Sequence, residues 1–303
     1  MNSNNEIEFR IAGGLGNQLF MYCAGVYFQQ KFQRNIVFDI SDLNRIKLLH
    51  AGVNILDLGL LDEHNTKTHQ VFSWKKYDFW KTKKGYEKIW DRLLALVNLS
   101  KINRPSEIGF VDLSKIPART KAIEGYFQTW KFHAEIYQKP LISSDSLTNP
   151  TQWFLDNALL MRQGPVAVFH VRRGDYASLE NRAFGMLSLS FFKKTSGMIP
   201  DHFERWIFTD SPEALEKDLE SMGTQFKLIV PPDDSDPIES LLLMSMASHI
   251  VISNSTYSWW AATLAGKNAT VYAPSKWFQH RVDPVDLLPS DWIKIPSEWE
   301  IGQ

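Results

Sequence analysis

The chain has 303 residues, of which 44% are hydrophobic and 22% are charged, which is ordinary for a soluble globular protein of about two domains. Its 33 basic and 34 acidic side chains give a net charge of -1, which excludes the strong positive field of a typical nucleic-acid-binding protein. With one cysteine, Cys23, and no run of about 18 apolar residues, we expect neither an internal disulfide nor a membrane-spanning helix.

The first residues are polar and lead directly into a predicted strand, so we expect no signal peptide and no amino-terminal membrane anchor. The use of a single cysteine is consistent with a reducing compartment. The protein is therefore predicted to be cytoplasmic.

The first predicted unit is a strand, a glycine-rich loop and a helix. Apolar and polar residues alternate over residues 7–11, and residues 13–18 then read Gly-Gly-Leu-Gly-Asn-Gln. From Leu19 onward apolar residues recur at helical spacing, and residues 35–40 predict a second strand. Backbone N–H groups in such a loop can approach an anion at the helix amino terminus. The spacing matches neither the dinucleotide fingerprint nor a Walker loop, so the loop alone identifies no ligand.

Residues 74–92 interleave aromatic side chains with lysines. This composition suits a lipid–water interface, where rings lie at headgroup level and cations meet anionic lipid. A surface for single-stranded nucleic acid, or a solvated helix surface with extended lysine stems, would have the same composition. We retain peripheral contact with the inner membrane as the prediction for this stretch, and we expect no nucleic-acid partner.

A domain boundary is predicted between residues 149 and 150. Residues 122–130 predict a short strand running into an aromatic loop, and residues 143–150 then lack periodicity and are rich in turn formers. Beyond the boundary, strands and helices alternate as in a parallel, doubly wound α/β sheet. The predicted strands are 166–171, 205–209, 226–230, 249–252 and 269–273, and the predicted helices are 151–161, 212–222, 238–247 and 256–264.

Polar side chains follow these strands at the edge where open α/β sheets bind their ligands. The strand at 166–171 ends in Arg172 and Arg173, and guanidinium groups bind phosphate oxygens in pairs. Residues 253–256 read Ser-Asn-Ser-Thr at a helix amino terminus, which is a second candidate anion site. A charged turn and an ordinary helix cap would explain each feature alone, but together they predict a diphosphate site.

A metal site has less support. Asp234 and Asp236 form the kind of pair that holds a divalent ion against a nucleotide diphosphate, but they lie in a proline-rich loop typical of a solvated turn. The histidines show no zinc-ligand spacing. Because arginine and a helix terminus can neutralise a leaving diphosphate, we expect no metal and no other cofactor.

Four segments carry a resemblance to a known family. They resemble, in the same order, segments of the bacterial α-1,2-fucosyltransferases of glycosyltransferase family 11, and they span nearly the whole chain. The segments are 13–20, 125–128, 169–176 and 252–262. The resemblance implies a GT-B fold, in which two Rossmann-like domains face an interdomain cleft. Residues 1–149 would form the acceptor side and residues 150–303 the GDP-binding side.

The resemblance also implies an inverting transfer of L-fucose from GDP-fucose to the 2-hydroxyl of a β-galactoside, without a metal. The acceptor would be a galactose-terminated oligosaccharide or lipid-linked glycan of O-antigen or lipopolysaccharide type. Two alternatives stay open. One is a transferase of the same fold with another GDP-sugar donor, and the other is a non-catalytic sugar-nucleotide or glycan-binding module.

Roles for individual residues follow from the same resemblance. Arg172 would hold the β-phosphate as fucose departs, and Asp175 would accept or orient the proton of the attacking hydroxyl, with Glu180 as a second candidate. Either carboxylate could instead only position the neighbouring arginine. Residues assigned to the donor are Gly16, Asn17, His170, Arg173, Glu239, Ser255, Thr256 and Ser258. Residues assigned to the acceptor are Tyr126 and Gln128.

One position departs from the family pattern. Family members commonly carry an aspartate, which could read the guanine edge, where this chain has Ser240. Glu239 stands one position away, and a shift of one residue turns a helical side chain by about 100°. The resemblance therefore predicts diphosphate binding more directly than guanine selectivity.

Overall fold

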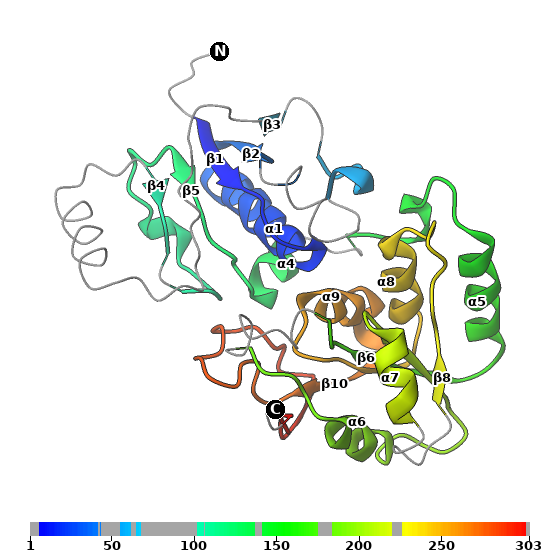
Figure 1. Ribbon diagram of the computed structural model, residues 1–303. Coiled ribbons are helices and arrows are strands. Elements are labelled where there is room, and N and C mark those ends of the chain that lie inside the picture. The colour runs from blue at the N-terminus through cyan, green and yellow to red at the C-terminus, as the bar shows by residue number, and fades with distance from the viewer. Residues whose placement is uncertain are drawn as a thin grey trace.

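The computed structural model describes residues 6–41, 43, 55–61, 65–67, 102–105, 107–136, 141–174, 184–219 and 226–300. These residues form two α/β halves, each built on its own parallel sheet (Figure 1). The predicted α/β class and the GT-B type of fold, with two Rossmann-like domains, are confirmed. The predicted boundary at residues 149 and 150 falls between the last strand of one sheet and the first of the other, and its exact place stays a prediction.

The amino-terminal sheet has the strand order β3-β2-β1-β5-β4, and its pairs are parallel. Helix α1, Leu15–Phe32, covers the face that carries Phe9, whose ring centroid lies 5.6 Å from that of Phe28 on the helix. The strands are β1 Glu6–Arg10, β2 Asn35–Asp39, β3 Thr66–Lys67, β4 Ile102–Asn103 and β5 Ala122–Ile123.

The carboxy-terminal sheet has the order β11-β10-β9-β6-β7-β8, again with parallel pairs. Strand β6, Val166–Val171, is buried along its whole length, as its unbroken apolar run predicts. The other strands are β7 Glu204–Thr209, β8 Phe226–Leu228, β9 His249–Val251, β10 Thr270–Pro274 and β11 Ile293–Ile295. The helices are α5 Gln152–Gln163, α6 Leu189–Ser196, α7 Pro212–Leu219, α8 Pro237–Ser245 and α9 Thr256–Ala265.

The differences from the predicted elements are local. The prediction of an aromatic loop that extends to Trp130 is wrong for that residue, because helix α4, Trp130–Ile136, begins there. Helix α6 and strands β3, β4 and β11 are additional elements, and the three strands are too short to carry a periodic pattern of their own. Short 3-10 helices complete the described chain. They are η2 Ile55–Leu58, η3 Leu113–Lys115, η4 Ser144–Ser146 and η8 Gly266–Asn268.

The two halves are joined where the amino termini of α1 and α9 meet. Gly16, in the first turn of α1, lies so close to α9 that a β-carbon on it would stand 2.5 Å from the carbonyl carbon of Thr256. The indole Nε1 of Trp260 donates a hydrogen bond of 2.8 Å to the Gly16 carbonyl. The ring of Phe20 packs against Trp259 and Trp260, with centroid distances of 4.5 and 5.1 Å. One hydrophobic core therefore continues from one half into the other.

A second contact between the halves is made by backbone groups of Val285 and Asp286. The carbonyl of Val285 accepts from the N–H of Phe110 at 3.1 Å. The carbonyl of Asp286 accepts from the Thr129 hydroxyl at 2.8 Å and from the N–H of Trp130 at 3.1 Å. This connection fastens segments before and after β5 to the carboxy-terminal half.

Within the described ranges, no helix combines the length and the apolar character needed to cross a membrane. The stretch 74–92, for which contact with the membrane was predicted, lies outside those ranges.

Replacing Gly16 with alanine should destabilise the protein by about 1–3 kcal/mol, because the added methyl group would overlap the backbone of Thr256. Gly14→Ser is the matched control. It lies in the same loop, a β-carbon added there would meet nothing within 4 Å, and serine is favoured at its helix N-cap position. Chemical denaturation should show a lower midpoint for Gly16→Ala only. Equal midpoints for the two variants would contradict the close contact of the helices.

Candidate anion-binding site

The candidate site is built around the carboxyl end of β6. This strand lies between β7 and β9 in the sheet, so the residues that follow it stand between the ends of both neighbours. Arg172 and Arg173 come directly after β6, and Ser253 follows shortly after β9. The expected gathering of these strand ends at one edge is thus present.

Asp210, which follows β7, holds the arginine turn in shape. Its Oδ1 accepts hydrogen bonds from the backbone N–H groups of Arg173 at 2.8 Å and Gly174 at 3.2 Å. Its Oδ2 lies 3.1 Å from the Nε of Arg172. A β-carbon on Gly174 would stand 2.3 Å from that same oxygen, so a larger residue here would displace the carboxylate. The carboxylate therefore fixes both the backbone of the turn and the direction of the Arg172 side chain.

The two arginines have different surroundings. The side chain of Arg172 is 24% exposed beside Asp210. Arg173 is buried, and its Nη1 donates to Glu300 near the end of the chain, while its Nη2 is buried without a hydrogen-bond partner. Arg172 is thus the more accessible of the two cations, and Arg173 links the turn to residues that pair with the segment around Leu187.

His170 is buried and has a neutral imidazole at neutral pH. Its Nδ1 lies 2.8 Å from the hydroxyl of Ser253, and its ring centroid is 5.7 Å from that of Tyr257 on α9. Burial lowers the pKa of His170 from 6.5 to about 4; Asp210 opposes this effect, and Arg172 adds to it. His170 therefore contributes hydrogen bonding and packing here rather than positive charge.

The amino terminus of α9 supplies a second set of donors. Ser255 is its N-cap residue, yet its side chain makes no capping hydrogen bond. The hydroxyl of Ser258 is committed within the helix turn, donating to the Ser255 carbonyl at 3.1 Å. Thr256 lies against Gly16. His170, two residues before Arg172, contacts Ser253 and Tyr257 at this end of α9. The positive end of α9 and the arginine turn are therefore neighbours.

Asn254 is occupied in holding the surrounding loops together. Its amide Nδ2 lies within hydrogen-bond distance of the carbonyls of Phe184, Gly185 and Trp277, at 3.2, 3.0 and 3.2 Å. This buried side chain connects the segment before α6 to the segment after β10. It is a supporting residue of the site.

The amino-terminal half contributes Asn17 and Gln128. Asn17 lies in the first turn of α1, beside Gly16, so the helix contact brings it close to the amino terminus of α9. The Nε2 of Gln128 donates to the Oδ1 of Asn17 at 2.9 Å, which fixes the Asn17 amide. Tyr126 lies two residues earlier and is partly buried. The structure thus brings Asn17 and the predicted acceptor residue Gln128 into contact.

Glu239 is engaged inside the protein. Its two carboxylate oxygens accept from the N–H and the hydroxyl of Thr151, each at 2.6 Å, and only 1% of its surface is exposed. This contact ties the N-cap of α5 to α8. Ser240, beside it, is also buried. The assignment of Glu239 to the donor stays a prediction, and these hydrogen bonds give the carboxylate a structural task.

Two predicted residues, Asp175 and Glu180, lie outside the described part of the chain. Asp236, from the Asp-x-Asp pair, accepts from the N–H of Ile238 at 2.8 Å and caps α8. Among the described residues, histidine, cysteine and acidic side chains form no group of three that could hold a metal ion.

The sequence predicts Asp210 among the polar residues at this edge of the sheet, together with Thr209 and Ser211, but it gives Asp210 no role and does not point to Glu300. The pairing of β6 with β7 brings Asp210 to the arginines. An acidic residue at the end of a strand that neighbours β6 is the signal that could have assigned this role to it. Glu300 has no such signal, because it reaches Arg173 across 127 positions of sequence.

The known proteins to which this chain is similar are all described as glycosyltransferases. The model of glycosyl transferase family 11 matches residues 7–295. The O-antigen biosynthesis glycosyltransferase WbnK of Escherichia coli is 26% identical, covering 94% of this chain and 99% of the relative. An α-1,2-colitosyltransferase of Escherichia coli is 25% identical, covering 94% and 97%. Among solved structures, fucosyltransferase NodZ from Bradyrhizobium aligns over 87% of this chain and 94% of its own, with 11% identity and a TM-score of 0.46.

The lowered pKa of His170 predicts a pH-dependent stability. Its unfolded pKa of 6.5 lies above its folded pKa of about 4, so the unfolded state binds more protons between these values and stability falls as the pH drops through them. The loss on going to about pH 4 should approach 3 kcal/mol, at about 1.36 kcal/mol per pKa unit. His170→Asn, which can keep the contact with Ser253, should flatten the profile of unfolding free energy against pH. An unchanged slope would contradict a neutral, buried His170.

Proposed function

The chain belongs to glycosyl transferase family 11, and from this membership we propose that it transfers L-fucose from GDP-fucose to the 2-hydroxyl of a β-galactoside. The acceptor is a bacterial surface glycan of O-antigen or lipopolysaccharide type, and the anomeric carbon is inverted. The observation that carries the proposal is the meeting of three positive features: the arginine turn held by Asp210 and the amino termini of α1 and α9. Together they suit a diphosphate.

Catalysis in this proposal depends on the charge that develops on the leaving group. The acceptor oxygen bonds to C1 of fucose as the bond from C1 to the β-phosphate oxygen breaks, and GDP leaves with the electron pair. Arg172 faces the growing charge, with its Nε oriented by Asp210 at 3.1 Å. The hydroxyl proton passes to a carboxylate, for which Asp175 is our first candidate and Glu180 the second.

Binding without a metal is part of the same proposal. Arg172 and the uncapped N–H groups of α9 supply positive charge at one place, which is the task a divalent ion performs in other nucleotide-sugar sites. Arg173, anchored to Glu300, supports the turn or adds a donor through its free Nη2. Asn17 contributes an amide from the amino-terminal half, fixed by Gln128.

A second candidate donor is another GDP-linked deoxyhexose. The relative that transfers colitose is as similar to this chain as the O-antigen transferase, at 25% against 26% identity. The chain also lacks a free carboxylate at positions 239 and 240, because Glu239 is bound to Thr151. Donor selectivity therefore needs its own measurement, with GDP-fucose, GDP-colitose and GDP-mannose as donors and with GDP, ADP and UDP as competitors.

Incubation of the protein with GDP-fucose, a panel of β-galactosides and a chelator should yield an α-1,2-fucosylated product identified by mass spectrometry. Arg172→Ala should lower the transfer rate by about a hundredfold or more, as expected for a group that stabilises transition-state charge. Arg162→Ala, an exposed arginine on α5, is the matched control and should transfer at the normal rate. GDP binding without turnover on any donor and acceptor would favour a non-catalytic binding module.

Asp210→Asn should lower transfer by about tenfold or more, since it removes the charge that orients Arg172 while leaving an oxygen for the backbone N–H groups. Asp201→Asn, at the opposite end of β7, is the control because its side chain is fully exposed. If Asp210→Asn turned over as fast as the control variant, Asp210 would have no part in orienting the arginine.

A further inference from the structure

A row of charged residues of alternating sign crosses the amino-terminal sheet near the carboxyl ends of its strands. Lys67 pairs in register with Asp39, and Asp39 pairs with Arg10. Glu124 follows Ile123, the partner of Phe9, and so stands beside Arg10, while Arg104 follows the partner of Ile123 on β4. Residues in register across a parallel sheet lie on one face. The row therefore runs from Arg104 through Glu124 and Arg10 to Asp39, and Lys67 comes next in register, with its Nζ paired to Glu6 at the start of β1.

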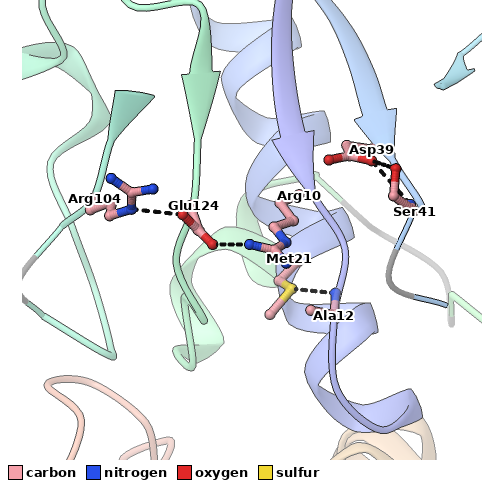
Figure 2. Close-up of polar contacts among 7 residues, drawn as sticks. All are labelled: Arg10, Ala12, Met21, Asp39, Ser41, Arg104 and Glu124. Atoms are coloured by element: carbon pink, nitrogen blue, oxygen red, sulfur yellow. Dashed lines mark hydrogen bonds and ion pairs between the residues drawn. The ribbon is translucent and has the colours of Figure 1, made fainter. Parts of the chain in front are cut away.

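Glu124 uses both of its carboxylate oxygens in this row, as Figure 2 shows. One oxygen accepts from Nη1 of Arg10, and the other accepts from Nε of Arg104 at 2.7 Å. The Glu124 side chain is 9% exposed and the Arg104 side chain is 32% exposed. Glu124 thus holds the two arginines in place, and the row is exposed at both ends, since the Lys67 side chain is 42% exposed.

Asp39 has one oxygen without a partner. Its Oδ1 accepts from the N–H of Ser41 at 3.0 Å and from the Ser41 hydroxyl, but its Oδ2 is buried without a hydrogen bond. Only 1% of the residue is exposed. In Figure 2 this second oxygen points away from Ser41, on the side of Arg10. A buried acceptor without a donor costs free energy, which a ligand that brings a donor would recover.

The same half contains a second unmet acceptor, the Oε1 of Gln128, four positions after Glu124. Gln128 is buried, and its Nε2 is already used by Asn17. The two buried oxygen acceptors lie on segments that leave β2 and β5, the strands on either side of β1, and a ligand with several O–H or N–H donors could pair with both. Sugar hydroxyls supply donors and also accept from guanidinium groups.

We propose that the row binds the acceptor sugar, with a hydroxyl donating to Oδ2 of Asp39 and Arg10 donating to a neighbouring sugar oxygen. Adjacent strands are about 4.8 Å apart, so this pair can hold hydroxyls on adjacent carbons. Sugar hydroxyls suit this pair because they can donate to one member and accept from the other. Because Asp39 is only 1% exposed, binding requires the Arg10 side chain to rotate and open a path to Oδ2. This inference rests on the proposed function, since it identifies the acceptor class of that transferase.

The test uses Asp39→Asn, which keeps an oxygen for the turn with Ser41 but removes the charged acceptor. Asp112 provides a matched control, because the N–H and the hydroxyl of Ser114 bind its Oδ1 at 3.1 and 2.6 Å in the same type of turn. Its other oxygen faces Lys115 at 3.4 Å on the exposed surface. Asp112→Asn therefore repeats the substitution without touching the proposed site.

With a neutral galactoside acceptor, Asp39→Asn should raise the acceptor KM about tenfold or more, with the GDP-fucose KM and the slow hydrolysis of GDP-fucose unchanged. Asp112→Asn should match the unmodified protein in all three measurements. An unchanged acceptor KM, or an equal loss of hydrolysis and transfer, would overturn the site. Thermal unfolding of both variants separates these outcomes from a folding defect, and Asp39→Glu, which keeps the charge, should recover part of the acceptor affinity if folded.

Failure of the proposed function can be told apart from failure of this site. If no donor supports transfer, binding of lactose and N-acetyllactosamine is measured directly by saturation-transfer NMR without nucleotide. Binding that Asp39→Asn weakens and Asp112→Asn does not would support the site even though fucosyl transfer had failed. No binding of either disaccharide to the unmodified protein would overturn it.

Discussion

The contact between the amino termini of α1 and α9 is the interaction on which the rest of the structure depends. Two helix amino termini both carry partial positive charge, so bringing them together is unfavourable unless packing compensates and an anion can lie nearby. Gly16 permits the approach, and the rings of Phe20, Trp259 and Trp260 stabilise it from beneath. The same contact between α1 and α9 thus joins the two halves and creates the positive environment for a diphosphate.

Much of the donor side could be predicted from sequence because its signals are local. The apolar run of β6, the arginines after it and the hydroxyl-rich turn before α9 each have a pattern that identifies element and chemistry together. The α/β class follows from the alternation of such segments, and the family from four short stretches in order. Individual roles at the site remain predictions, with Asp175 outside the described residues.

The rest could not be predicted because it depends on register and on contacts between distant residues. Nothing local marks Asp210 as the acceptor for the arginine turn, since that role exists only once β6 and β7 pair. Glu239 illustrates the reverse case. Its position beside a family motif residue suggests a role at the donor, but its carboxylate accepts from Thr151, which lies 88 positions earlier. Very short strands such as β4 escape detection, and with them the partner that Arg104 finds in Glu124.

The continuous core between the halves has a consequence for the entropy of the reaction. A hinge opening there would expose Phe20, Trp259 and Trp260 to water, and burying one such aromatic side chain stabilises a protein by about 2 kcal/mol. The backbone hydrogen bonds of Asp286 oppose the same opening. The groups on the two halves are therefore arranged during folding, before any substrate binds. Two sugars that bind to halves already fixed relative to each other react at a high effective concentration, because binding costs little further conformational entropy of the protein.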